Sequence, residues 1–194
     1  MKTYLPPIAK LSTVILPLIF LSACSASSPE NTRNMTEALG SLCGKTFSGT
    51  VISQDPQDAD WRKEVLKVGP VRCDTPNLIE MPLAVGENTS RTWFLSGRET
   101  TLELRHQHLL ADGSLDPVTN YGGVVTQVPK FTDRVWRAEF PADALTVSVF
   151  KEHGLDPSIT NVWALEYVAE TTLTYELTRE NRDFRAVFDL TNPL

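Results

Sequence analysis

The chain lacks the signatures of several common protein classes. It has no apolar run of about 20 residues, the length that a transmembrane helix requires. It has no phosphate-binding loop, no Gly-x-Ser-x-Gly nucleophile elbow and no parallel βαβ rhythm. It also lacks a basic patch, because 18 Lys and Arg residues stand against 24 Asp and Glu residues. An acidic chain of this kind argues against nucleic acid as a partner, and no cofactor is predicted.

Acidic residues are absent from the first 23 positions. Lys2 and Lys10 give this segment a positive charge, and an apolar run extends from Leu11 to Leu21. The run has only about half the length of a membrane-spanning helix, so it predicts a cleaved export signal over residues 1–23. Removal of the two lysines would raise the acidic excess from six charges to eight.

The predicted signal ends in the sequence Leu21-Ser22-Ala23-Cys24. This motif resembles the lipobox of bacterial lipoproteins, in which an apolar residue and two small residues precede a cysteine. The resemblance implies that Cys24 is acylated and becomes the first residue of the mature protein, anchored in a membrane by its acyl chains. The alternative is an ordinary signal cut after Ala23, which would leave Cys24 as a free thiol. Ser25 stands where an Asp would resemble an inner-membrane retention signal, which favours an outer-membrane anchor facing the periplasm.

The segment after Cys24 is polar and lacks apolar periodicity up to Thr36. We expect residues 24–39 to form the lipidated N-terminus and a flexible tether. Residues 40–194 remain for one folded domain, and roughly 155 residues suffice for a single hydrophobic core.

Two further cysteines, Cys43 and Cys73, lie inside the predicted domain. Because the periplasm is oxidising, two cysteines in an exported domain are expected to pair as a disulfide. A metal site is the alternative, but no other cysteine and no nearby histidine completes a ligand set.

Most of the domain alternates between apolar and polar residues, as half-buried strands do. The alternation is clear in Lys45–Ser53, in residues 79–85 and in the C-terminal hairpin formed by Thr172–Arg179 and Asp183–Leu190. Nine or ten short strands at this spacing predict an all-β domain, an antiparallel up-and-down β-barrel. Gly122-Gly123 is interpreted as a bend into a strand.

The stretch from Asp143 to His153 is the exception to this pattern. Asp143 is a suitable helix cap, Leu145 and Val149 lie four residues apart, and Gly154 is a typical helix stop. The β-branched residues in this stretch favour a strand instead. We predict a short helix near 143–153, before the last three strands.

The segment Leu104–Gly123 concentrates the polar residues that chemistry would use. On a strand, His106 and His108 would share the inward face with Leu102 and Leu104. The two imidazoles could bind one zinc ion, with Asp112, Asp116 or His153 as a third ligand. They could also contact a polar ligand together with Asp112 and Tyr121, or serve only as structural hydrogen-bonding groups.

The same segment carries a second resemblance. Leu104-Arg105-His106-x-His108, Asp112-Gly113, Tyr121-Gly122-Gly123 and the closing Phe184–Leu190 resemble a group of uncharacterised proteobacterial secreted proteins and lipoproteins. The overall plan is similar to lipocalin-like barrels, although Phe47-Ser48-Gly49 stands where lipocalins have Gly-x-Trp. Neither resemblance implies an enzymatic activity.

Several aromatic residues could line a ligand cavity or pack in the core. They are Trp61, Trp93, Trp136, Trp163, Tyr167 and Tyr175. The leading functional hypothesis is an envelope protein that binds a small molecule in its barrel or an envelope partner on its surface. A metal-binding protein or metal-dependent hydrolase using His106 and His108 and a purely structural surface lipoprotein are the alternatives.

Overall fold

The computed structural model describes residues 38–98, 101–125, 130–132 and 134–194. The strands are β1 (Phe47–Val51), β2 (Leu66–Val68), β3 (Leu78–Val85), β4 (Asn88–Arg98), β5 (Thr101–His108), β6 (Tyr121–Val124), β7 (Lys130–Phe131), β8 (Val135–Pro141), β9 (Val162–Val168), β10 (Thr172–Arg179) and β11 (Arg182–Asp189). The α-helix α2 covers Ala144–Glu152, and the short 3-10 helices are η1 (Gly40–Leu42), η2 (Pro56–Asp58), η3 (Trp61–Lys63) and η4 (Asp156–Ser158).

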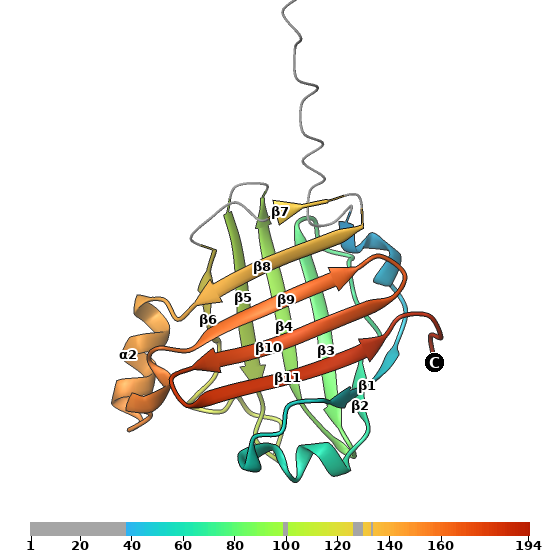
Figure 1. The fold of residues 1–194 in the computed structure, drawn as a ribbon. Helices are drawn as coiled ribbons and strands as arrows, with labels where there is room; N and C mark the ends of the chain where they lie inside the picture. The colour runs from blue at the N-terminus through green and yellow to red at the C-terminus, as the bar shows by residue number, and fades with distance from the viewer. Residues whose placement is uncertain (1–37, 99–100, 126–129, 133) are drawn as a thin grey trace, which may run out of the picture. The chain divides into compact units, whose positions relative to one another are not determined.

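The strands form one antiparallel meander that curls into a nearly closed barrel (Figure 1). In the sheet order β6-β5-β4-β3-β2-β1-β11-β10-β9-β8-β7, every neighbouring pair is consecutive in the chain except β1 and β11. The pairing of β1 with β11, which places Gly49 opposite Phe188, joins the two halves of the meander. The predicted all-β, up-and-down, lipocalin-like barrel is therefore confirmed.

The barrel seam lies between β6 and β8, where a bridge joins Gly123 to Ala142. A Cβ atom on Gly122 would lie 1.8 Å from the Leu104 carbonyl oxygen, and one on Gly123 would lie 1.9 Å from the Pro141 carbonyl oxygen. The glycine pair thus allows β6 to approach a strand on each side. It lies within β6 and not at the bend before it, which corrects the interpretation from sequence.

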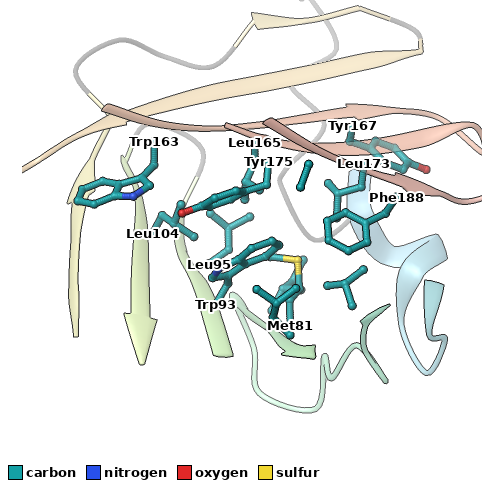
Figure 2. Packing of buried hydrophobic residues seen from close by; sticks show 14 of the residues in the cluster. Met81, Trp93, Leu95, Leu104, Trp163, Leu165, Tyr167, Leu173, Tyr175 and Phe188 are labelled. Carbon is teal, nitrogen blue, oxygen red and sulfur yellow. The ribbon is translucent and has the colours of Figure 1, made fainter. Parts of the chain in front are cut away.

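The core fills the barrel because alternate residues of each strand point inward. On β3, Ile79 and Met81 are fully buried, and on β5 Leu102 and Leu104 are buried on the face that the sequence predicts. Figure 2 shows side chains from both walls meeting in this interior, among them Phe188. Each buried side chain of this size contributes about 1.5–3 kcal/mol relative to exposure.

Helix α2 forms at the predicted place and is held against the barrel by polar contacts. The Asp143 side chain accepts a hydrogen bond from the Thr146 amide at 2.9 Å, as an N-cap should. The Thr146 hydroxyl, which is fully buried, accepts from the Gly122 amide and donates to the Gly122 carbonyl, both at 2.7 Å. Arg105 of β5 donates to Asp143 at 2.5 Å, so the helix start is tied to the wall. The helix prediction is confirmed.

Cys43 and Cys73 form the predicted disulfide, with their Cα atoms 5.8 Å apart. The bond fixes the segment before β1 to the segment before β3. Leu39 is completely buried and Ala38 packs against the core, so the folded domain begins before the expected boundary at residue 40. The disulfide and this N-terminal packing anchor the chain at its entry to the barrel.

The predicted signal peptide, the lipobox cysteine Cys24 and the tether up to residue 37 lie outside the described residues. The alternating pattern also predicts a strand over Val124–Val128, of which residues 126–128 lie outside the described residues. Within the described residues, no helix has the length and apolar character needed to cross a bilayer.

Candidate functional site

A cavity of about 310 Å³ lies at the end of the barrel where the β3–β4 and β10–β11 hairpins turn. Strands from both walls and the segment containing η2 and η3 contribute its lining. The lining residues are Gln57, Asp58, Trp61, Leu83, Arg91, Trp93, His106, Gln107, Tyr121, Tyr175, Leu177, Arg182 and Phe184. Five of these thirteen residues are Trp, Tyr or Phe, a composition typical of small-molecule sites.

The cavity exists because the inward row of several strands changes from apolar to polar at this end. On β4, Arg91 is in phase with the buried Trp93 and Leu95. On β5, His106 continues the row of Leu102 and Leu104. On β11, Arg182 lies on the same face of the strand as the buried Phe184, Ala186 and Phe188. The polar side chains at these three positions line the cavity.

His106 is held in a defined orientation by both ring nitrogens. Nδ1 lies 3.2 Å from the Tyr121 carbonyl oxygen, and Nε2 lies 2.9 Å from the Tyr175 hydroxyl. The carbonyl can only accept, so this network assigns the proton to Nδ1, and the Tyr175 hydroxyl donates to Nε2. Burial lowers the pKa of His106 from 6.5 to about 4, against the favourable effect of the Tyr121 carbonyl. The imidazole is therefore neutral at pH 7.

The two tyrosines beside His106 are hydrogen-bonding groups and not anions. Burial raises the pKa of Tyr121 and raises that of Tyr175 well above 10. The Tyr121 ring stacks on the His106 ring with centroids 4.9 Å apart. Since Tyr175 already donates to His106, its oxygen is left to accept. This arrangement suits recognition by hydrogen bonds; a general base at neutral pH would need a free Nε2.

Aromatic rings form the remaining walls of the cavity. Trp93 and Tyr175 stack from opposite strands with centroids 4.3 Å apart and an interplanar angle of 10°. Trp61, from η3, meets Phe184 edge-to-face at 5.4 Å. Ring pairs of this kind are rigid and contribute about 0.5–1.5 kcal/mol beyond their buried area. The walls are therefore preformed.

Arg91 lies over the Trp61 ring, with its guanidinium carbon 5.2 Å from the ring centroid. Its Nη1 atom donates to the Asn88 side-chain oxygen and to the Ser90 hydroxyl, each at 3.3 Å. Both acceptors are neutral, and within the described part of the chain Arg91 forms no ion pair. Its charge is thus balanced by no direct contact.

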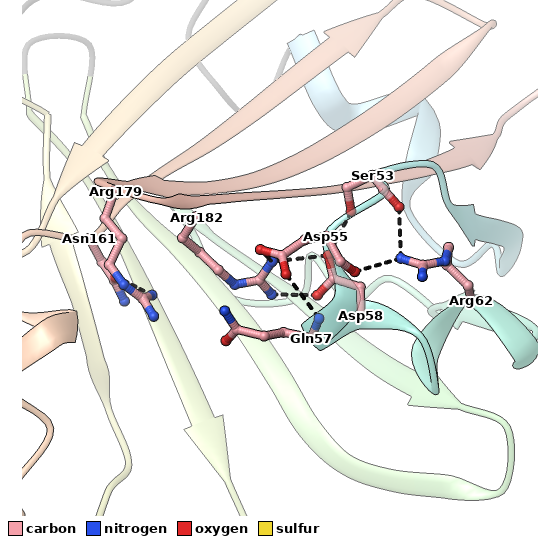
Figure 3. Close-up of polar contacts among 8 residues, drawn as sticks. All are labelled: Ser53, Asp55, Gln57, Asp58, Arg62, Asn161, Arg179 and Arg182. Atoms are coloured by element: carbon pink, nitrogen blue, oxygen red, sulfur yellow. Dashed lines mark hydrogen bonds and ion pairs between the residues drawn. The ribbon is translucent and has the colours of Figure 1, made fainter.

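Arg182 is the opposite case, because two carboxylates hold it (Figure 3). Its Nη2 donates to Asp58 at 2.5 Å and its Nη1 donates to Asp55 at 3.0 Å. The hydrogen bond that Arg182 donates to Asp58, opposed by burial, raises the pKa of Arg182. Ser53 donates to Asp58 at 2.8 Å, and Arg62 donates to the Asp55 carbonyl at 2.7 Å. The two ion pairs of Arg182 fasten the segment of η2 and η3 to β11, and the other two hydrogen bonds hold that segment together.

The structure separates the residues that the sequence grouped as one site. His106 and Tyr121 line the cavity. His108 shares the inward parity of His106 but pairs with Asp116 at 2.9 Å. Asp112 accepts hydrogen bonds from the amide and hydroxyl of Ser114 in an exposed turn. Binding of a ligand by His106 and Tyr121 stays a prediction.

The zinc hypothesis needs a third ligand beside the two histidines. Among the residues that the structure describes, no three His, Cys, Asp or Glu side chains are grouped to hold a metal ion. His153, one proposed ligand, is exposed at the end of α2, where its Nδ1 lies 3.0 Å from the Val149 carbonyl oxygen. Both nitrogens of His106 already have protein partners.

Sequence reasoning found only some of the cavity residues. Of the six aromatic candidates, Trp61, Trp93 and Tyr175 line the cavity, whereas Trp136, Trp163 and Tyr167 lie in the core. Arg91, Arg182 and Asp58 were missed. The two arginines could have been found, because each is in phase with buried residues of its strand; Asp58 gives no such signal.

The chain has no significant match among protein-family models, curated proteins or solved structures. Its function must therefore be argued from the barrel and the cavity themselves.

Proposed function

We propose that this chain is a lipid-anchored protein of the bacterial cell envelope whose barrel binds a small molecule. The anchor rests on the motif Leu21-Ser22-Ala23-Cys24 behind an apolar run without acidic residues. Ser25 supports an outer-membrane anchor facing the periplasm. The tether would hold the barrel away from the membrane surface.

The observation that carries the binding proposal is the change of the inward rows from apolar to polar around a 310 Å³ cavity. A barrel whose only task is structural would gain stability by filling this end with apolar side chains. Here Arg91, His106 and Tyr175 face the space instead, and aromatic rings fix its walls. Directed polar groups beside rigid aromatic walls are a usual composition of a ligand site.

The competing function is contact with an envelope partner through the outer surface. A cavity-filling substitution distinguishes the two functions. Leu177 is a half-buried residue of the cavity lining, and Leu177→Trp would occupy the space. Leu110→Trp is the matched control, because Leu110 is 44% exposed and lies outside the lining.

The test uses protein purified from envelopes and examined by native mass spectrometry. We expect the native chain and Leu110→Trp to carry a co-purified small molecule that Leu177→Trp has lost. Partner capture by all three proteins with no bound molecule in any of them would contradict the cavity proposal and favour the surface role.

A further inference from the structure

We infer that the ligand is a compact organic anion, a ring bearing a carboxylate, whose charge is bound by Arg91 and whose ring lies against the aromatic walls. This inference rests on the proposed small-molecule function and specifies the ligand class of the same cavity. Three features of the lining support it: the charge balance, the available donors and the size of the space.

The charge balance depends on the difference between the two arginines of the lining. Arg182 meets the carboxylates of Asp55 and Asp58, so its charge is compensated within the protein. Arg91 lies over the Trp61 ring, and its only hydrogen bonds within the described part of the chain go to the neutral oxygens of Asn88 and Ser90, at 3.3 Å each. A ligand carboxylate could replace these long contacts with short charge-assisted hydrogen bonds, for which the forked guanidinium is well suited.

The available donors lie on the same side of the cavity. The Tyr121 hydroxyl donates to no described residue, although its ring is fixed by stacking on His106. Arg91 and Tyr121 lie on the same wall, because Arg91 of β4 is opposite His108 of β5 and Tyr121 of β6 is opposite His106 of β5. The charges of Arg91 and of Asp116, which pairs with His108, both act on Tyr121. The His106 imidazole is neutral and adds no charge. The polar side of the cavity therefore offers one uncompensated cation and a phenolic donor, which suits an anionic acceptor.

The size and walls of the space select against a long chain. A volume of about 310 Å³ lies at the low end of the range for ligand pockets, about 300–1,000 Å³. Trp61 and Phe184 meet edge-to-face with their ring centroids 5.4 Å apart, and Trp93 and Tyr175 stack with nearly parallel rings. Flat walls around a small volume match a ring and its carboxylate better than a fatty acyl chain.

Three probe ligands, benzoate, benzamide and laurate, separate the effect of the ligand's charge from that of its size. Benzamide has the shape of benzoate without its charge, and laurate has the charge with a long chain. Binding to the purified protein is measured by calorimetry and by the fluorescence of the cavity tryptophans. We expect benzoate to bind at least tenfold more tightly than benzamide and more tightly than laurate.

Arg91→Gln should weaken benzoate binding by about 10- to 100-fold, the effect of losing a charged hydrogen-bond partner, while benzamide binding changes little. Arg91→Lys should retain part of the benzoate affinity, because it keeps the charge but loses the fork. Arg134→Gln removes the same charge from an exposed site outside the cavity lining and should leave both affinities unchanged. Thermal melting of each variant shows whether it is folded.

Each contrary result has a distinct meaning. If benzamide binds as tightly as benzoate, or if Arg91→Gln does not weaken benzoate, the anionic class is wrong and the cavity function stands. If laurate binds best, the compact-ring assignment is wrong. If no probe binds and the envelope-purified protein carries no molecule, both the ligand class and the proposed function fail.

Discussion

The Tyr175 hydroxyl and the His106 Nε2 atom lie 2.9 Å apart inside the barrel, on strands β10 and β5 of opposite walls. The hydrogen bond spans the interior and connects residues 69 positions apart in the chain. It fixes the imidazole tautomer, because Nδ1 must then donate to the Tyr121 carbonyl. The pair therefore fixes the tautomer and the orientation of the histidine, while burial keeps it neutral.

The protein should lose stability as the pH falls from about 6.5 to about 4, in part through His106. The pKa of this histidine is about 4 in the folded chain and near 6.5 when it is unfolded. In this window the unfolded chain binds the proton more readily, so acid favours unfolding. The loss of unfolding free energy that is due to His106 reaches about 3 kcal/mol below pH 4.

Urea unfolding at several pH values checks this expectation. His106→Gln, which does not titrate, should show a shallower loss of unfolding free energy between pH 6.5 and 4 than the native protein. The difference between the two curves isolates His106 from the carboxyl groups that titrate in the same range. Parallel curves would contradict the assignment of a neutral, buried His106.

Tyr175→Phe should lower the free energy of unfolding by about 1–2 kcal/mol, because the His106 Nε2 atom loses its donor. Stacking on Trp93 is retained, since the ring is unchanged. Tyr167→Phe is the matched control: it removes the hydrogen bond to Ser41 at 2.8 Å, near the other end of β10. Both changes should reduce stability in chemical denaturation, but only Tyr175→Phe should alter small-molecule binding. Equal effects on binding would assign no special role to Tyr175.

Asp58→Asn should destabilise the protein by about 3 kcal/mol, because it leaves the charge of Arg182 partly unpaired in a buried place. Asp60→Asn provides the comparison, since Asp60 pairs with Lys63 on the surface and its side chain is 92% exposed. Thermal melting should show a clear loss for the first variant and none for the second. Proteolysis near η2 and η3 should also accelerate in Asp58→Asn alone, because this segment is then less firmly held to β11.

Removal of the disulfide by Cys43→Ala with Cys73→Ala should cost roughly 3–4 kcal/mol of stability in the chain-entropy model, since the bond closes a loop of 30 residues. Reduction of the native protein should reproduce the loss seen in the double variant. Thiol alkylation of the unreduced protein should label neither cysteine. Unchanged melting after full reduction would show that N-terminal packing alone holds this region.

Cys24→Ala should abolish lipid attachment, because the lipobox cysteine supplies the only acceptor thiol that the motif defines. Incorporation of labelled palmitate and membrane fractionation measure the effect. The variant should remain as an unlipidated precursor or as a soluble product, with the barrel folded. Incorporation equal to that of the native protein would contradict the lipobox interpretation.

Local pattern was sufficient to predict most of the fold. The period-two alternation of Leu173, Tyr175 and Leu177, and of Phe184, Ala186 and Phe188, specifies strands with one buried face, because side chains alternate across a strand. The helix near 143–153 was predictable from its cap at Asp143 despite β-branched residues in its interior. These signals come from residues close together in the chain. Burial of one face of a strand or helix is enough to select its secondary structure.

The sequence by itself determined most of the strands, the helix, the cysteine pair and the inward direction of His106, but not β6 and β7. Only the tertiary structure decided which polar residues meet. Arg182 and Asp58 lie more than a hundred positions apart, and the closure of β1 on β11 brings them together. His106 and His108 lie on the same face of β5, yet His106 is hydrogen-bonded to Tyr175 and His108 pairs with Asp116. Strand periodicity is fixed by neighbouring residues, whereas the partners of inward side chains depend on the curvature and closure of the whole sheet.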